Sequence, residues 1–314
     1  MSLTSGGPTV SPHPWPNCPP RALSPNRATH AGAMAIDLLA SDPRGTVGAT
    51  FDRSLYLRTD RGHWICVGRG LPLGPLNVGV DALAWTQRLQ GTPRGTRWAL
   101  NGQTIALPQT SIALDATHAW HPPSAFDATA RVDIATVRRR LTRLHGTSPR
   151  TPLLRSVVAQ DVLGPPRWYH QARAGLDALR SWRRQGADPE PVARGLLGLG
   201  DGLTPSGDDV LVGALVALHA HCQVDAARAL ERAIERWGPS QTHELSLAHL
   251  RAAYRGAASE PLHRVLAALV RPTPPSDVAR AFQSLQCIGA SSGEDALAGA
   301  LIVLNPCQAN EATT

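Results

Sequence analysis

The chain has 314 residues, a net charge of +7 and a hydrophobic fraction of 42%, so it is long enough for two ordinary globular domains. All 31 basic residues are arginine. The chemistry of a Schiff-base lysine, a lysine general base or a Walker-type lysine is therefore excluded. The arginines are dispersed, and three Phe and three Tyr are too few for a base-stacking platform, which argues against nucleic-acid binding.

The first thirty residues are rich in proline and lack the apolar core of a secretory signal, so residues 1–30 are expected to be a disordered leader. The five cysteines form no C-x-x-C pair, and their number is odd. Reduced thiols in a cytoplasmic protein are the simplest account. The longest nearly apolar run, Val210–Ala220, is too short to span a bilayer, so no membrane association is expected.

Residues 31–125 are expected to form a β-rich domain. Short segments rich in β-branched and aromatic residues are separated by turn signals such as Thr59–Gly62. The candidate strands are 46–57, 63–67, 77–80 and 104–107. Regularly spaced short strands indicate a small barrel or sandwich.

Residues 126–314 change to a helical period, which begins with the apolar spacing of Val132, Ile134, Val137, Leu141 and Leu144. Proline-rich breaks at 164–166 and 272–275 separate the later helices. Those helices are expected at 168–185, 206–221, 225–237, 241–255, 260–270, 277–286 and 292–304. The predicted fold class is α+β, a β-rich barrel or sandwich followed by an α-helical domain.

One motif occurs twice in the helical half. Ser206–Leu215 (SGDDVLVGAL) is echoed by Ser292–Leu301 (SGEDALAGAL), at an offset of 86 residues. The shared pattern is S-G-[DE]-D-x-L-x-G-A-L. Two copies of an acidic helix start predict two helix N-termini that converge on one pocket.

The start of each copy fits a helix cap. Ser206 and Ser292 are expected to be N-caps, whose hydroxyls accept a hydrogen bond from a backbone N–H one turn on. Asp209 and Asp295 occupy the reciprocal position of a capping box. Capping leaves the second acid of each copy unexplained, which favours a functional site over a structural repeat.

The glycines inside the two copies, Gly213 and Gly299, carry a separate implication. Glycine within a helix costs about 1 kcal/mol relative to alanine. Its occurrence at both equivalent positions predicts either close helix–helix approach or a ligand pressed against the backbone.

Two well-known catalytic or nucleotide-binding motifs are incomplete in this sequence. Gly202 and Gly207 have P-loop spacing, but Asp208 stands where the lysine is required. His243-Glu244 is followed by His249, so the zinc-protease pattern is absent.

A glycine-rich loop that opens an acid-bearing helix has its own chemistry. Free N–H groups at a helix start bind phosphate or carboxylate oxygens. Acids beside them repel an anion unless a divalent cation bridges the two or an acid takes up a proton. Asp208, Asp209 and Asp295 are the candidate catalytic residues. Asp208, Asp209 and Glu294 are candidate ligands of a Mg²⁺ ion, and no cofactor is certain.

The substrate-binding candidates are the residues around the two helix starts, whose backbone N–H groups at 204–207 and 290–293 would hold anion oxygens. With no lysine in the chain, a side-chain cation must come from arginine, and Arg255 is the candidate for a bidentate carboxylate contact. The other candidates are Gly200, Gly202, Thr204, Ser206, Gly207, Ser291, Ser292 and Gly293.

These residues resemble a known family. The run G-L-G-x-G-L-T-P-S-G-D-D at 198–209 is similar to the signature of the AllH-like family, which includes a subunit of bacterial oxamate carbamoyltransferase. Asp201 departs from the proline expected between the glycines. Supporting elements across residues 45–304 are Gly74–Val78, Thr242-x-x-x-Ser246, Ala258–Leu262 and Ile288–Gly293.

The resemblance implies a role in purine or allantoin breakdown, where oxalurate and phosphate are interconverted with oxamate and carbamoyl phosphate. It also implies a hetero-oligomer with other transferase subunits, one of them similar to an acyl-CoA synthetase. The standard transcarbamoylase motifs S-T-R-T-R and H-P-x-Q are missing. Three functions stay open: a catalytic carbamoyltransferase subunit, a non-catalytic binding or scaffold subunit, and a Mg²⁺-dependent hydrolase.

Overall fold

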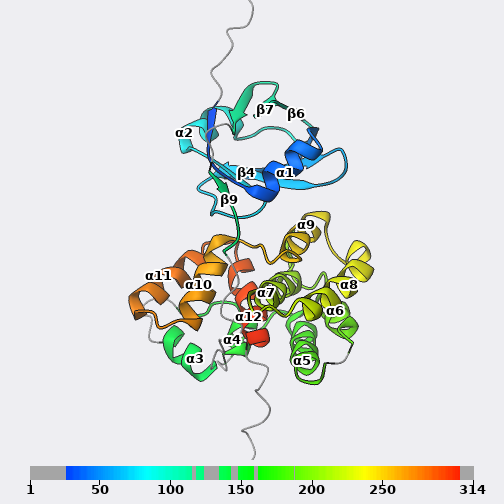
Figure 1. Cartoon of the computed structure of the whole chain (residues 1–314), viewed down its shortest axis with the longest axis vertical. Helices are drawn as coiled ribbons and strands as arrows, with labels where there is room; N and C mark the ends of the chain where they lie inside the picture. The colour runs from blue at the N-terminus through cyan, green and yellow to red at the C-terminus, as the bar shows by residue number, and fades with distance from the viewer. Residues whose placement is uncertain are drawn as a thin grey trace, which may run out of the picture.

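The computed structural model describes residues 26–114, 118–123, 134–142, 148–158, 162–186 and 188–304. It consists of a β-barrel and a helical domain stacked along the long axis of the molecule (Figure 1). Two separate apolar cores, one in each part, hold the chain together. The expected α+β class, with a β-barrel preceding the helices, is confirmed.

The barrel closes because its first strand pairs on both sides. β1 is hydrogen-bonded to β8 in parallel and to β5 in antiparallel orientation, and the remaining neighbours follow the order β5-β4-β3-β2-β6-β7-β8. The strands are β1 Asn26–Gly32, β2 Arg44–Thr50, β3 Ser54–Thr59, β4 Trp64–Arg69, β5 Asn77–Val80, β6 Arg97–Asn101, β7 Thr104–Leu107, β8 Thr110–Ala113 and the short β9 Ala119–Trp120. Among the described strands, closure leaves no long unpaired edge.

Side chains of β3 alternate between the two sides of the barrel wall, as the period of two in a strand requires. Leu55 and Leu57 are fully buried in the barrel core. Ser54, Tyr56 and Arg58 therefore point outward. This outer face of β3, together with Trp64 of β4 and the loop that contains Leu73, meets the helical domain.

Two expectations for the N-terminal part need correction. The segment 46–57 is not one strand but a hairpin, because the chain turns between Thr50 and Ser54. The run of β-branched and aromatic residues concealed this turn, which has neither glycine nor proline. β1 begins at Asn26, five residues inside the expected 1–30 leader; residues 1–25 lie outside the described residues.

Three short helical elements accompany the barrel: α1 Ala33–Ser41, α2 Ala82–Ala84 and a π-helical turn at Trp85–Leu89. The helical domain contains α3 Ile134–Thr142, α4 Pro152–Val157, α5 Tyr169–Gln185, α6 Glu190–Leu196, α7 Ser206–Ala220, α8 Val224–Gln241, α9 Glu244–Ala253, α10 Glu260–Val270, α11 Pro275–Leu285 and α12 Ser292–Leu304. Each of the seven later helices expected from the periodicity is present within a few residues of its expected bounds. In the described part of the chain, no helix combines the length and apolarity needed to cross a membrane.

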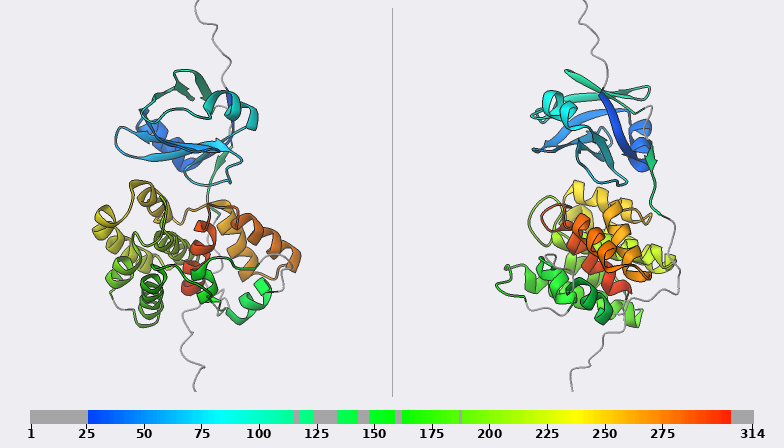
Figure 2. Two further views of the ribbon diagram at one scale, coloured as in Figure 1. Left: turned by 180° about the vertical axis from the view of Figure 1, so that it is seen from behind. Right: turned by 90° about the vertical axis from the view of Figure 1, so that its left-hand side faces the viewer.

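Helices α7 and α12, which carry the repeated motif, form the centre of the helical domain (Figures 1 and 2). Both are apolar on all sides and almost completely buried, as expected for helices surrounded by others. They lie in contact through their glycines. A Cβ atom added to Gly213 would stand 1.7 Å from the carbonyl oxygen of Ala296, and one added to Gly299 would stand 1.9 Å from that of Val210.

These two contacts are equivalent within the repeat, because Val210 and Ala296 occupy the same position of the motif. The pair of helices is thus related by an approximate twofold axis that passes between the glycines. Of the two explanations offered by the sequence, close helix–helix approach accounts for Gly213 and Gly299.

The barrel contacts the helical domain through polar groups. The guanidinium of Arg58 donates two hydrogen bonds to the carboxylate of Glu244, at 2.8 Å and 3.0 Å. The indole of Trp64 donates to the same carboxylate at 3.3 Å. A backbone hydrogen bond from the N–H of Glu260 to the carbonyl of Leu73 measures 2.7 Å.

We predict that Gly213→Ala destabilises the protein by at least about 3 kcal/mol, because its methyl group would collide with backbone that cannot move aside. Urea denaturation followed by circular dichroism measures the change. Gly195→Ala in α6 is the control: its methyl group would lie 3.3 Å from the Cα of Gly175, and the gain in helix propensity offsets the crowding. Equal stability of the two variants would contradict the proposed role of the glycine contact.

Candidate functional site

A cavity of about 470 Å³ lies between the barrel and the helical domain. Its barrel wall is formed by Arg53 and the outer face of β3, by Cys66, and by the loop 70–77. Its helical wall includes Thr204, Asp209 and Val212 from the first copy of the motif, Ser292, Gly293 and Ala296 from the second copy, and His249 from α9. The two helix starts therefore converge on one cavity, as the repeat predicted.

The local structure of the helix starts differs from the expected capping box. Pro205 occupies the N-cap position of α7, and no side chain caps this helix. Ser206 and Ser292 are the first residues of their helices. The expectation that Ser206 is an N-cap was wrong, because the proline-led turn satisfies the N–H groups of Asp208 and Asp209 with the carbonyl of Pro205. In the second copy, Ser292 is likewise already helical, and the N–H of Asp295 donates to the carbonyl of Ser291 at 3.0 Å.

The serine hydroxyls are thereby free to face the other copy of the motif. Ser206 lies beside Asp295, and Ser292 lies beside Asp209, so each serine neighbours the carboxyl group of the other helix. The hydroxyls of Thr204 and Ser292 are 3.1 Å apart and link the loop before α7 to the start of α12. The contacts repeat the approximate twofold relation of the glycines.

Asp209 and Asp295 form a buried acid pair at the centre of this arrangement. Asp295 is 0% exposed and Asp209 is 7% exposed. Burial raises the pKa of Asp209 well above its ordinary value, and the charge of Asp295 raises it further, against the opposing effect of the Ser292 hydroxyl. Burial raises the pKa of Asp295 to about 6, although the hydroxyls of Ser206, Thr151 and Ser291 oppose the rise.

The acid pair lacks the hydrogen bonds that buried carboxylates normally make. Within the described chain, no donor meets hydrogen-bond geometry at either oxygen of Asp295 or at Oδ2 of Asp209, although the hydroxyls of Ser206 and Ser292 lie near enough to oppose the rise of the two pKa values. Two buried, adjacent and unpaired carboxyl groups cannot both be ionised without a large cost. Burial and mutual repulsion therefore favour the protonated form of the pair.

Asp208, in contrast, is fully engaged by the protein. Its Oδ1 accepts a hydrogen bond from the N–H of Gly198 at 2.8 Å. Its Oδ2 accepts from the hydroxyl of Ser246 at 2.6 Å and from the hydroxyl of Thr242. Burial raises the pKa of Asp208, and these hydrogen bonds oppose the rise. Asp208 thus clamps the glycine-rich loop to α9, which explains the Thr242-x-x-x-Ser246 spacing.

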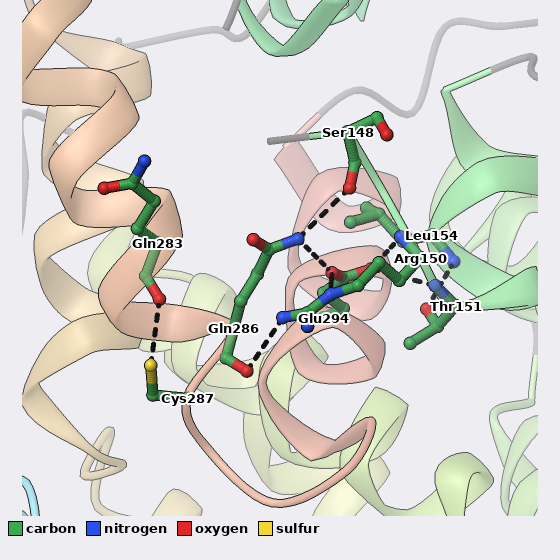
Figure 3. A network of polar contacts seen from close by, with 8 residues as sticks. All are labelled: Ser148, Arg150, Thr151, Leu154, Gln283, Gln286, Cys287 and Glu294. Carbon is green, nitrogen blue, oxygen red and sulfur yellow. Dashed lines mark hydrogen bonds and ion pairs between the residues drawn. The ribbon is translucent and has the colours of Figure 1, made fainter. Parts of the chain in front are cut away.

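Glu294 has the same role in the second copy (Figure 3). Its Oε2 accepts hydrogen bonds from the N–H groups of Arg150 and Thr151 at 2.7 Å and 2.9 Å. Its Oε1 accepts from the side chain of Gln286 at 2.6 Å. Glu294 fixes the segment before α4 to the start of α12, and none of these contacts leads into the cavity.

The three acids named as candidate Mg²⁺ ligands therefore do not converge. Asp208 and Glu294 point to different protein partners, and Asp209 alone of the three lines the cavity. Among the described residues, no group of three or more His, Cys, Asp or Glu side chains is arranged to hold a metal ion. The donor set does not fit Mg²⁺, and the catalytic role expected of Asp208 is replaced by that of a clamp.

Some of the backbone N–H groups that were expected to bind an anion already donate hydrogen bonds within the protein. The N–H of Gly207 donates to the carbonyl of Leu199 at 2.8 Å, and that of Gly293 donates to the carbonyl of Ile288 at 3.3 Å. In the described chain, the N–H groups of Thr204 and Ser292, both residues of the cavity wall, have no backbone partner.

The glycines before α7 shape the loop and do not line the cavity. Gly200 and Gly202 have φ angles of +119° and +94°, which L-residues with side chains rarely adopt. A Cβ atom on Gly200 would stand 2.6 Å from the backbone nitrogen of Ser206. Ser291 and Ser206 are also not part of the cavity wall.

The sequence analysis named the wrong arginine as the positively charged side chain of the cavity. Arg255 is exposed in the turn after α9 and does not line the cavity. Among the described residues that do, Arg53 is the one with a permanent positive charge. Arg53 was missed because it lies within 46–57, which the sequence pattern assigned to a single strand.

His249 is a second residue that the sequence analysis set aside. It was considered only as a zinc ligand, yet it lines the cavity from α9. Burial lowers the pKa of His249 to about 4, so its imidazole is neutral at pH 7. The thiol of Cys66 is unsuited to act as a nucleophile, because burial raises its pKa to about 12.

Comparison with known families supports the resemblance noted from the motifs. Residues 196–304 match the family described as "Oxamate carbamoyltransferase subunit AllH". The match covers α7 to α12, including both copies of the motif, and it does not extend to Gly74–Val78 or the rest of the barrel. No curated protein and no solved structure is similar enough to count as a match.

We predict that Asp208→Asn lowers the free energy of unfolding by about 2–4 kcal/mol. The amide NH₂ of asparagine would face hydrogen-bond donors, the Gly198 N–H or the Ser246 hydroxyl, that now donate to the carboxylate. Thermal denaturation measures the loss. Asp201→Asn, an exposed change in the same loop, is the control and should leave the melting temperature unchanged. A fully stable Asp208→Asn protein would refute the assignment of Asp208 as a clamp.

Asp295→Asn should have the opposite effect near neutral pH. Since burial raises the pKa of Asp295 to about 6, the folded protein holds a proton that the unfolded chain releases between about pH 4 and 6. The stability contributed by this group is therefore lost as the pH rises through that window. The asparagine variant should be more stable than wild type at pH 7.5, by up to about 3 kcal/mol, and should show a smaller decline from pH 5 to 7.5. Melting temperatures at both pH values decide the matter, and a variant that is less stable at pH 7.5 would show that ionised Asp295 is stabilising.

Proposed function

We propose that this chain is a subunit of an oxamate carbamoyltransferase-like enzyme that binds a small carboxylate-bearing substrate in the cavity between barrel and helices. The observation that carries the proposal is the composition of this cavity. It joins the two motif copies of the family-matched region to Arg53, an arginine from outside that region. The match to a carbamoyltransferase subunit supports the choice of substrate class.

The cavity supplies the groups that an oxamate-like acid needs. A guanidinium pairs with a carboxylate through two parallel hydrogen bonds, which suits Arg53 to the acid end of the substrate. The uncommitted N–H groups of Thr204 and Ser292 add donors without adding charge. His249 is neutral and can exchange hydrogen bonds with a substrate without repelling a cation.

In the proposed reaction, oxalurate and phosphate are converted to oxamate and carbamoyl phosphate. Its phosphate side carries at least two negative charges, whereas the described cavity wall offers one guanidinium. We therefore assign the phosphate-binding groups to another subunit, which fits the description of the matched family as a subunit. In this proposal the chain acts in purine or allantoin breakdown, in the cytoplasm, as part of a hetero-oligomer.

A non-catalytic scaffold is the second candidate. It is favoured by the state of the Cys66 thiol in the cavity wall, which burial keeps protonated and therefore weakly nucleophilic. Direct attack of one substrate on the other needs no such nucleophile, so this observation does not exclude catalysis. Ligand binding by the chain itself separates the two candidates.

Isothermal titration of the purified full chain with oxamate and with carbamoyl phosphate tests the proposal. We expect oxamate to bind, Arg53→Gln to weaken its binding at least tenfold, and carbamoyl phosphate to bind measurably only after partner subunits are added. Arg94→Gln, which changes an exposed arginine of the barrel outside the cavity, is the matched control and should bind oxamate as wild type does.

Transfer activity completes the test. The chain reconstituted with its partner subunits should release oxamate from oxalurate in the presence of phosphate, and Arg53→Gln should reduce that rate. Absence of oxamate binding, both in the isolated chain and in the complex, would overturn the transferase proposal in favour of the scaffold.

A further inference from the structure

The cavity between the barrel and the helices is larger than a small acid needs. Its volume of about 470 Å³ lies within the range of roughly 300–1,000 Å³ that is typical of pockets for drug-sized ligands. Part of its lining is apolar, and the described wall offers Arg53 as its one permanent positive charge. A small acid and a phosphate bound together would leave space and negative charge that the described part of this chain does not match.

On the barrel side, the residues just before the cavity wall are exposed. Phe51 is 46% exposed and Asp52 is also exposed, and the two directly precede Arg53 and Ser54 of the wall. The rings of Phe51 and Tyr56 meet edge to face with their centroids 5.8 Å apart, and Tyr56 is itself part of the wall. Phe51 therefore lies at the edge of the cavity and faces solvent.

The glycine-rich loop presents the same combination on the helical side. Leu203 is 40% exposed and directly precedes Thr204 of the cavity wall, and Asp201 is exposed two residues earlier. The base of this loop is fixed by the hydrogen bond from the N–H of Gly198 to Asp208, at 2.8 Å. Leu203 is thus held beside the cavity with much of its side chain in water.

We call these four exposed residues, Phe51, Asp52, Asp201 and Leu203, the rim. Each side of the cavity contributes to it one large apolar side chain and one acid. Within the described chain neither acid forms an ion pair, although the whole sequence carries a net charge of +7. Single exposed apolar side chains are common on protein surfaces, whereas apolar groups gathered around a cavity mark an interaction site. The surface that complements this rim is apolar and basic.

We propose that the rim is the docking surface for a partner subunit, which covers the cavity with an apolar segment that carries basic side chains. This inference rests on the proposed function, because it takes the chain to be one subunit of a transferase. It adds where the partner sits and what the partner supplies, namely the positive charge for phosphate that the described cavity wall lacks. A second copy of this chain docked rim to rim would place acid against acid, which favours a different subunit as the occupant.

Two native cysteines test the proposal without any substitution. Cys287 is exposed and lines the cavity, whereas Cys222 is exposed just after α7 and does not line it. Mass spectrometry of the cysteine peptides measures how fast N-ethylmaleimide alkylates each thiol, in the isolated chain and in the complex co-purified with its partner subunits. We expect complex formation to slow the alkylation of Cys287 at least about tenfold, because an interface excludes solvent, and to leave that of Cys222 unchanged.

Substitutions in the rim are the second measurement. Leu203→Ser should weaken the affinity for the partner subunits at least about tenfold, measured by biolayer interferometry. Val224→Ser is the matched control, since Val224 is also 40% exposed but begins α8, outside the cavity. Asp201→Arg should likewise weaken the complex, whereas Asp60→Arg, which changes an exposed acid of the barrel outside the cavity, should not.

The outcomes separate this inference from the proposed function. If the complex forms while Cys287 stays as reactive as in the isolated chain, or if Leu203→Ser binds the partner as well as Val224→Ser does, the docking surface is wrong and the proposed function stands. Protection of Cys287 by self-association of the isolated chain would make a second copy the occupant and overturn the proposal. If Cys287 is protected in the complex but oxamate binds neither the chain nor the complex, the proposed function fails and the docking surface stands. If no partner subunit binds the chain, both fail.

Discussion

The contact between α7 and α12 determines the geometry of the helical domain and of the cavity. With Gly213 against the carbonyl of Ala296 and Gly299 against that of Val210, the two backbones approach as closely as their atoms allow. Any side chain at either glycine would separate the helices and move the residues of their first turns. The pairing of Asp209 with Asp295, and the position of each serine beside the carboxyl group of the other helix, require this close approach. The contact between the hydroxyls of Thr204 and Ser292 requires it as well.

The same symmetry explains why each motif copy carries two acids. The first acid of each copy, Asp208 or Glu294, turns outward and holds a distant segment of chain through backbone N–H groups. The second, Asp209 or Asp295, turns inward toward its counterpart. The outer acids have their hydrogen bonds completed by the protein, whereas the inner acids do not. This division gives one position of the motif the contacts that hold other segments in place, and the other position a buried pair of carboxyl groups without such contacts.

The sequence predicted most of this framework and missed its tertiary partners. The internal repeat correctly implied that the helix starts converge, and the paired glycines correctly implied close packing, because both signals depend on backbone geometry. The capping box failed because a serine hydroxyl can choose a neighbouring helix over its own backbone, and Pro205 already fixed the first turn. Arg53 could not be found because its approach to the helices depends on how the barrel docks, and no local pattern near Arg53 encodes that docking.

The cavity has one wall from each of two independent hydrophobic cores, joined by the Arg58–Glu244 pair and a backbone hydrogen bond at Leu73. A small ligand bound in this cavity, as proposed above, would contact both of these units at once. Its binding energy adds to the docking energy of the barrel. Such a ligand would favour the docked arrangement of the two cores as well as occupy the cavity.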